Sequence, residues 1–236
     1  MARRGSTSGT AEALATEEAV PEWKRQSVDR SLQAARARAQ ERTDRFVAAA
    51  MELLHDQGGI EFTVQEVVER SRMSIRTFYN FFASKEDLLV AVHETILANV
   101  VVPHLRERCA RESDPVQAIR AYIDGCFELT ENPGPASRAV TSYHYRLVET
   151  RPDDLQRASR PQLALVLELV EAAVDAGRLR NLDPAKTAQL VHDTVLAAIH
   201  GRILWPDHRV PVTADDLWEF CAWGLGVEAP AKQRRA

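Results

Sequence analysis

Three helix starts fall within the 28 residues from Phe62 to Leu89, which read FTVQEVVERSRMSIRTFYNFFASKEDLL. Thr63 and Glu66 have the spacing of a capping box, in which two side chains satisfy backbone N–H groups of the first helical turn. Ser74 is suited to cap a second short helix, and Ser84, which acidic residues follow, is suited to cap a third.

Apolar residues recur at helical spacing across this stretch and give both short helices an inward face. They are Val64, Val67, Val68, Met73, Phe78 and Phe82. Two short helices joined by a tight turn form a helix-turn-helix unit, whose second helix enters the major groove of DNA.

The run from Met73 to Leu88 resembles the signature of the TetR family of bacterial transcriptional regulators. That signature joins a V-S-x-x-T-(L/F)-Y-x-x-F recognition helix to an S-K-E-x-L helix start, and this chain has M-S-I-R-T-F-Y-N-F-F followed by S-K-E-D-L. With the preceding helix, the resemblance covers roughly Arg38 to Ile96. It implies an all-α chain with an N-terminal three-helix helix-turn-helix DNA-binding domain and a C-terminal helical domain for ligand binding and dimerisation.

Two residues depart from the family pattern. Arg72 stands where the turn usually carries Gly, at a position that often needs a positive φ, and a non-Gly residue is strained there. Arg76 replaces a residue that is often small. The first departure bears on the geometry of the turn, and the second on which bases are read.

The composition is that of a soluble, helical chain. Its 236 residues allow one large domain or two smaller ones, and 45% apolar with 27% charged residues is ordinary for a globular protein. Ten Gly and few aromatic residues, with many Ala, Leu, Arg and Glu, favour an all-α fold.

The net charge of −4 is unevenly distributed. Residues 23–85 hold eleven Lys or Arg against eight Asp or Glu, a net +3, whereas residues 86–227 hold fourteen against twenty-one, a net −7. The basic part coincides with the helix-turn-helix region, which suits one end that faces DNA and one that is kept away from it. Chance unevenness is the alternative reading.

The cysteines and the apolar runs bear on the compartment. Cys109, Cys126 and Cys221 are scattered and form no C-x-x-C pair, which fits a reducing cytoplasm. The N-terminus lacks the apolar core of a signal peptide, and no apolar run approaches the ~20 residues of a membrane span. We therefore expect a cytoplasmic protein that does not cross a membrane.

The sequence divides into four predicted segments. These are a disordered N-terminal tail at 1–26, the helix-turn-helix DNA-binding domain at 27–84, the ligand-binding and dimerisation domain at 85–227, and a C-terminal tail at 228–236. The first helix is expected from about Ser27 to Gln57. Arg3 and Arg4 are candidates for a basic arm on DNA, although a solvated tail is the favoured reading.

A long helix is expected from Lys85 to about Arg111, with a kink at Pro103 because proline removes a backbone hydrogen bond and clashes with the preceding turn. Its expected inner residues are Leu88, Leu89, Val92, Ile96, Val100 and Val101. Start and stop signals then predict helices near 115–132, 136–150, 153–177, 184–205 and 213–224.

The recognition helix is short, so few side chains reach base edges. Arg76 is the best candidate for reading a base, since Arg pairs with guanine through two hydrogen bonds, and a phosphate contact is its close alternative. Asn80 reads a base or faces solvent, and Ser74 lies on or near the outward side.

Other residues are expected to contact the DNA backbone. By the resemblance, these are Thr63, Thr77, Tyr79 and Lys85, whose contacts position the protein without reading sequence. One or two of five arginines on the first helix are expected to meet phosphate, with a solvated helix face as the alternative. The five are Arg30, Arg36, Arg38, Arg42 and Arg45, of which Arg42 is the candidate we name.

The helices near 153–177 and 184–205 carry apolar stripes that bury against neighbours or against a second subunit. The stripes are Leu163, Val166, Leu167, Val170 and Val174, and Val191, Val195, Ala198 and Ile199. In the family the two penultimate long helices pair with their copies, which predicts a homodimer through these two helices. A purely intramolecular core is the alternative.

The resemblance also implies a pocket for a small apolar or amphipathic effector among the middle helices. Candidate lining residues mix apolar bulk with polar groups. They are Phe127, Tyr143, His144, Tyr145 and His192.

Catalytic and metal-binding patterns are not found. Glu52 to His55 is a single E-x-x-H, whereas a di-iron bundle needs two with two further Glu. H-E-x-x-H, G-x-S-x-G and phosphate-binding Gly loops are missing, and His192 and His200 are too far apart on one helix for one metal. We predict no catalytic residue, no metal site and no cofactor.

The predicted function is that of a homodimeric repressor that binds a palindromic operator in double-stranded DNA and is released by a small-molecule ligand. One alternative is an activator, or a regulator that works without a small ligand through a protein partner. A helical-bundle enzyme is the least favoured reading.

Overall fold

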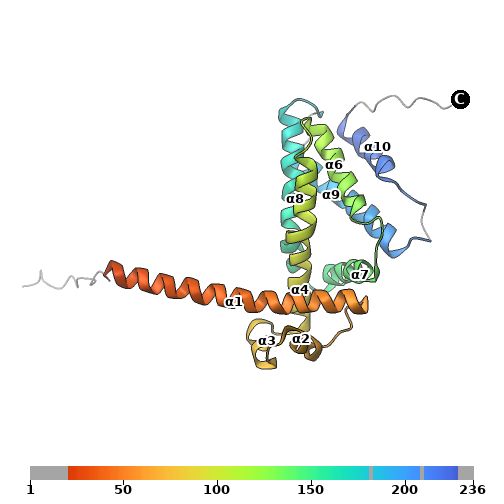
Figure 1. The fold of residues 1–236 in the computed structure, drawn as a ribbon. Helices are drawn as coiled ribbons and strands as arrows, with labels where there is room; N and C mark the ends of the chain where they lie inside the picture. The colour runs from red at the N-terminus through yellow and green to blue at the C-terminus, as the bar shows by residue number, and fades with distance from the viewer. Residues whose placement is uncertain (1–20, 181–182, 208–209, 228–236) are drawn as a thin grey trace, which may run out of the picture. The chain divides into compact units, whose positions relative to one another are not determined.

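The computed structural model describes residues 21–180, 183–207 and 210–227, where every regular element is a helix (Figure 1). The elements are α1 (Glu22–Gln57), α2 (Val64–Ser71), α3 (Ile75–Phe81), α4 (Lys85–Ile96), the π-helical η1 (Leu97–Val101), α5 (Val102–Cys109), α6 (Pro115–Glu128), α7 (Pro135–Thr150), α8 (Pro152–Asp175), α9 (Pro184–Leu204) and α10 (Ala214–Leu225). The predicted all-α fold with a helix-turn-helix region is confirmed.

The start of α1 differs from the prediction. The helix begins at Glu22 and not near Ser27, so the last residues assigned to a disordered tail are helical. The remaining tail residues, among them Arg3 and Arg4, and the tail at 228–236 lie outside the described residues.

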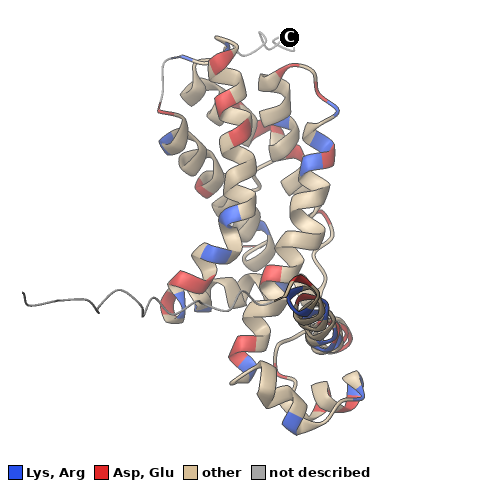
Figure 2. Ribbon diagram, turned by 90° about the vertical axis from the view of Figure 1, so that its left-hand side faces the viewer, with Lys and Arg blue, Asp and Glu red and all other residues tan. Residues whose placement is uncertain are grey.

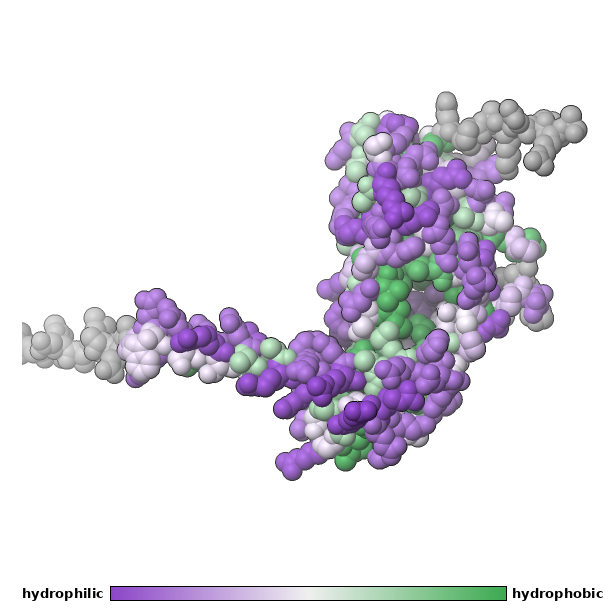
Figure 3. All heavy atoms as spheres, viewed as in Figure 1, coloured by the Kyte–Doolittle hydropathy of each residue, from purple (hydrophilic) through white to green (hydrophobic). Residues whose placement is uncertain are grey.

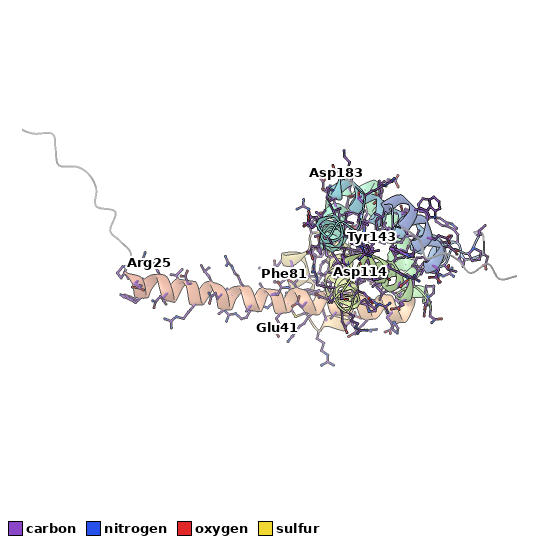
Figure 4. The ribbon with its side chains drawn as sticks, turned by 90° about the horizontal axis from the view of Figure 1, so that it is seen from above. Arg25, Glu41, Phe81, Asp114, Tyr143 and Asp183 are labelled. Carbon is purple, nitrogen blue, oxygen red and sulfur yellow. The ribbon has the colours of Figure 1, made fainter. Side chains whose placement is uncertain are left out.

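The chain divides into two compact units, with the division within α1. One contains the residues up to Thr43, and the other begins at Asp44. In the first unit the side chains of α1 project on all sides, as the labelled Arg25 and Glu41 illustrate (Figure 4), and every described residue up to Arg38 is exposed. The second unit holds the helix-turn-helix region and all helices after it.

The predicted caps of the helix-turn-helix are confirmed. Thr63 and Glu66 form the capping box of α2, with the Thr63 N–H donating to Glu66 Oε2 at 2.6 Å. The Ser74 hydroxyl accepts from the Thr77 N–H at 3.1 Å, and Ser84 forms a second capping box with Asp87. Short-range sequence signals therefore account for the start of each helix.

The turn between α2 and α3 requires a left-handed residue. Arg72 has φ 56° and ψ 36°, and it is the one non-Gly residue with positive φ in the described ranges. The Met73 N–H donates to the Val68 carbonyl oxygen at 3.1 Å, which closes the end of α2. The strained conformation expected at Arg72 is present.

An aromatic cluster joins α1 to α3. The Phe46 ring meets Phe78 edge-on at 5.4 Å and Phe82 at 6.2 Å, measured between ring centroids. Phe46 and Phe78 are fully buried. The prediction that Phe78 and Phe82 belong to the core is confirmed, and this core fixes α3 against α1.

The long helix after α3 contains a π-helical turn instead of a simple kink. Pro103 has no N–H for an α-helical bond to the Asn99 carbonyl, and the turn before it widens into η1, where the Val102 N–H donates to Leu97. The wider turn changes the phase of the side chains. Val100 is consequently 48% exposed, and its prediction as an inner residue was wrong.

The segment from Lys85 to Cys109 is long and apolar enough to cross a membrane by length and composition alone, contrary to the prediction for apolar runs. Some of its apolar residues are buried within this chain. Leu88 and Val92 belong to the core around Phe46, and Leu105 belongs to the core of the later helices.

The later helices pack around a second core. Helix α8 contacts both α6 and α9, and Val166 and Val170 of α8 are fully buried within this one chain. Val166 and Val170 are therefore covered within this chain, whereas Leu163, Leu167 and Val174 of the same stripe are only partly buried, and dimerisation through α8 and α9 stays a prediction. A periodic apolar stripe shows that a face is buried but not which chain buries it.

Candidate nucleic-acid interface and ligand pocket

The outward face of α3 presents the predicted DNA-contacting groups. Arg76, Tyr79 and Asn80 are exposed, Tyr79 with 57% of its surface. Among the described residues Arg76 has no ion-pair partner, so its guanidinium is available to a ligand.

The hydroxyl and ammonium groups flanking α3 are held in place. Ser74 Oγ and Thr77 Oγ1 lie 2.7 Å apart, and Thr63 Oγ1 donates to Glu66 Oε2 at 2.8 Å. The Lys85 ammonium lies 5.0 Å over the Phe62 ring. These contacts hold the N-termini of α2, α3 and α4 in place. At a helix N-terminus, backbone N–H groups and short polar side chains can donate hydrogen bonds to phosphate oxygens.

Arg42 lies in the other unit, exposed on α1. Figure 2, which views α1 nearly along its axis, shows both basic and acidic residues on this helix. Arg70 on α2 was not singled out from the sequence as a basic residue near the interface, and Arg72 was named there only for its backbone conformation. Arg70 is paired with Asp56 at 2.8 Å, whereas Arg72 is exposed beside α3.

A pocket of about 380 Å³ lies in the unit that contains the helix-turn-helix. Its walls come from the end of α1, from α4 and η1, and from α6, α7, α8 and α9. Apolar side chains gather around a hollow in this part of the molecule (Figure 3). The apolar lining includes Met51, Leu54, Ile96, Leu97, Val101, Leu129, Val140, Leu196, Ile199 and Ile203.

Of the five residues predicted to line the pocket, two do so in the structure and three lie elsewhere. His144 and His192 line the pocket. Phe127 instead packs under the Arg202 guanidinium at 4.9 Å, and the Tyr143 hydroxyl donates to the Glu86 carbonyl oxygen at 3.2 Å in the core below. Tyr145 is 43% exposed, with its ring 5.4 Å from the His200 ring.

Three further histidines that line the pocket, His55, His93 and His200, were not predicted from the sequence. His93 on α4 and His200 on α9 join His144 on α7, and we call these three the imidazole row. The His144 ring centroid lies 4.7 Å from that of His200 and 5.8 Å from that of His93. His93 falls at the helical spacing of Leu89 and Ile96, so the inner stripe of α4 was its signal in the sequence.

The imidazole row is uncharged at neutral pH. Burial lowers the pKa of His93 and of His144 to about 4, and that of His200 to about 3, each helped by a neighbouring imidazole. Neither ring nitrogen of His93 has a hydrogen-bond partner among the described residues. A buried polar atom without a partner costs roughly 1–3 kcal/mol, so this ring marks where a partner is missing.

His192 belongs to a separate hydrogen-bonded chain. Gln162 Nε2 donates to the Tyr122 oxygen at 3.1 Å, and that oxygen lies 3.3 Å from His192 Nδ1. Which of the Tyr122 hydroxyl and His192 Nδ1 donates in this hydrogen bond depends on the tautomer of the imidazole. Burial also lowers the pKa of His192.

The wall of the pocket contains no Lys, Arg, Asp or Glu among the residues that the structure describes. Within the same ranges, no group of His, Cys, Asp and Glu is arranged to hold a metal ion. The pocket therefore suits a mainly apolar organic molecule held by a few hydrogen bonds.

An exposed apolar surface lies on α9 and α10. Leu190 is 67%, Phe220 68% and Trp223 75% exposed, and the three line one groove. Large apolar side chains gathered on a surface mark an interaction site.

Comparisons with known proteins find relatives for the helix-turn-helix region and for the fold. Residues 46–92 match the family model described as "Bacterial regulatory proteins, tetR family". The HTH-type transcriptional activator FasR of Mycolicibacterium smegmatis is 23% identical over 193 residues, which cover 78% of this chain and 82% of that protein.

Two solved structures have the same fold. The structure of RolR in complex with resorcinol has a TM-score of 0.64 and 16% identity, over 81% of this chain and 91% of that one. FadR of Thermus thermophilus, described as a repressor in complex with lauroyl-CoA, has a TM-score of 0.61 and 20% identity, over 82% of this chain and 98% of that one.

Proposed function

The chain belongs to the TetR family of DNA-binding helix-turn-helix transcriptional regulators and is not an enzyme, and on this premise we propose that it is a cytoplasmic homodimeric repressor released from a palindromic operator by a small molecule. The observation that carries the proposal is the position of the pocket. Met51 and Leu54 of α1 and His93 of α4 line it, and these two helices also pack against the helix-turn-helix.

A ligand in the pocket has a direct route to the reading helix. Helix α7 places His144 in the pocket and, one residue earlier, Tyr143 against the Glu86 carbonyl at the start of α4. Arg151 at the start of α8 donates to Asp87 in the same turn of α4 at 2.7 Å. Movement of α7 on ligand binding is thereby transmitted to α4, and η1 gives that helix a place to bend.

The coupling is reciprocal. A ligand that favours a dimer whose recognition helices are wrongly spaced for successive major grooves weakens DNA binding, and DNA weakens ligand binding by the same factor. Dimerisation is proposed through the groove formed by Leu190, Phe220 and Trp223, since two readers about 34 Å apart match a palindrome. This adds α10 to the predicted dimer interface of α8 and α9.

The two structural relatives support a small-molecule ligand, because one was solved with resorcinol and the other with lauroyl-CoA. The curated relative favours a second candidate function, since it is named an activator. In that case the same reader and pocket would increase transcription. Control by a protein partner without a small ligand is a third reading, which the presence of the pocket disfavours.

The test is binding of the purified protein to DNA flanking its own gene, measured by fluorescence anisotropy against scrambled DNA across a salt series. We expect specific binding about 10³-fold tighter or more. In vitro transcription from that promoter then separates the two functions, because a repressor lowers the transcript level and an activator raises it. Equal affinity for both DNAs would contradict the proposal for this operator location.

A further inference from the structure

The pocket contains unused hydrogen-bonding groups but no charged wall. We propose that it binds an uncharged small molecule with at least one hydroxyl group on an apolar body, such as an alkylphenol, and that the hydroxyl is hydrogen-bonded by the imidazole row of His93, His144 and His200. The regulatory consequence of this binding rests on the proposed function, whereas the binding itself does not.

The absence of charge argues against anionic ligands. A carboxylate or phosphate buried without a cation pays a large desolvation cost, and the described wall offers neither Lys nor Arg. Two features of the lining could interact with an anion. One is the imidazole of His55, which is exposed, and the other is the first turn of α7, where Ala136 and Ser137 line the pocket near a helix N-terminus. The experiment below therefore includes an anionic probe.

A hydroxyl group matches what the imidazole row lacks. A neutral imidazole has one N–H donor and one N acceptor, and a hydroxyl both donates and accepts. His93 is 6% exposed, lines the pocket and has two unpartnered ring nitrogens, while His144 and His200 stand beside it. Because burial keeps these rings neutral, each has one ring nitrogen that accepts a hydrogen bond. An ether or an alkane has no hydrogen to donate to that nitrogen, whereas a hydroxyl has.

The remaining wall suits the apolar body. Leu97, Val140, Leu196, Ile199 and Ile203 come from three helical segments around the space. The volume of about 380 Å³ is more than twice the ~150 Å³ of a cavity that binds benzene. One ring with a short alkyl chain therefore fits, with the polar end at the histidines.

The experiment compares three matched probes by calorimetry on the full-length protein at neutral pH. They are a 4-alkylphenol, the corresponding 4-alkylanisole and the corresponding 4-alkylbenzoate, each from ethyl to octyl. We expect the best phenol to bind at least about tenfold more tightly than its ether and its carboxylate, which is roughly 1.4 kcal/mol. An ether of equal affinity, a tighter benzoate, or no phenol that binds would overturn the proposal.

Variants locate the hydroxyl. His144→Phe and His200→Phe should weaken the phenol about tenfold and leave the ether unchanged, because each removes one acceptor and keeps a ring. His144→Gln should restore part of the affinity. His104→Phe is the matched control, since His104 on α5 lies outside the lining and pairs with Glu128 at 3.6 Å. Equal losses for phenol and ether would show that the histidines act only through packing.

A parallel measurement of operator release keeps the two proposals apart. If phenols bind as expected but the operator affinity does not change, the ligand class stands and the proposed release mechanism fails. If a carboxylate or thioester releases the operator and phenols do not bind, the release mechanism stands and the ligand class fails.

Discussion

At the residue scale, Arg76 and Tyr79 share the outward face of α3 but offer different chemistry. Arg76→Ala should change base preference at one position of each half-site, at a cost of roughly 1–3 kcal/mol, because a base contact carries sequence information. Tyr79→Phe should weaken all sequences alike, as loss of a phosphate contact does. Binding to an operator library by both variants checks this, and a uniform loss for both would refute Arg76 as the base reader.

Arg72 stores backbone strain in the turn of the helix-turn-helix. At φ 56° an L-residue pays roughly 1–2 kcal/mol that Gly does not, so Arg72→Gly should raise the free energy of unfolding by about 0.5–1 kcal/mol. Gly177 provides the matched opposite, because its φ is 65° and a Cβ there meets no atom within 4 Å. Gly177→Ala should lower stability by about 1 kcal/mol in urea unfolding, and equal effects of both changes would contradict the strain argument.

These residues also show what sequence reveals. Thr63, Ser74 and Ser84 act on N–H groups three residues away, so their spacing was enough to predict each cap. Arg72 was recognisable because the family that the sequence resembles usually carries Gly at this position of the turn. The imidazole row was not, because His93, His144 and His200 lie far apart in sequence and meet only through the packing of three helices.

At the element scale, the link from α7 to α4 should carry the ligand signal. Tyr143→Phe removes the hydrogen bond to the Glu86 carbonyl and keeps the buried ring, so operator affinity without ligand should stay within about twofold. The ligand-induced loss of operator affinity should shrink by about fivefold or more. Tyr145→Phe on the same helix is the control, and equal behaviour of the two variants would remove Tyr143 from the pathway.

The helices around the imidazole row should also make stability sensitive to acid. The folded pKa values of His93 and His144, about 4, lie below the ordinary 6.5, so the unfolded chain takes up protons first. The contribution of these two histidines to the free energy of unfolding is therefore fully present above pH 6.5 and is lost as the pH falls toward 4. The loss is on the order of a few kcal/mol.

Urea unfolding at fixed protein concentration between pH 7 and 5 measures this loss before the carboxylates titrate. The carboxylates with lowered pKa, such as Glu66 and Asp154, lose their contribution only below their ordinary values of 4.5 and 3.8. His93→Phe should make the free energy of unfolding depend less steeply on pH, without a loss of stability at pH 7, because it replaces a buried ring that lacks hydrogen-bond partners with an apolar one. If the pH dependence of the free energy of unfolding is the same in this variant, folding does not lower the pKa of His93.

At the scale of the whole molecule, the proposed dimer depends on one exposed apolar surface. The apolar stripes of α8 and α9 were predicted from the same periodicity, and Val166, Val170 and Val195 on them are buried within one chain. Phe220 and Trp223 on α10 are instead exposed. Pattern alone does not distinguish a face covered by its own chain from one left for a partner. The exposed residues therefore give the sharper test of the proposed dimer.

Trp223→Asp should dissociate the dimer, because it places a charge in the centre of an apolar contact and removes a large buried area. We expect the dimer dissociation constant to rise about 100-fold or more by sedimentation, and operator affinity to fall with it because one half-site holds one reader. Trp23→Asp is the matched control, since Trp23 is a similarly exposed tryptophan, at 65%, on α1. If Trp223→Asp stays dimeric, as Trp23→Asp should, the partner subunit binds elsewhere than α9 and α10.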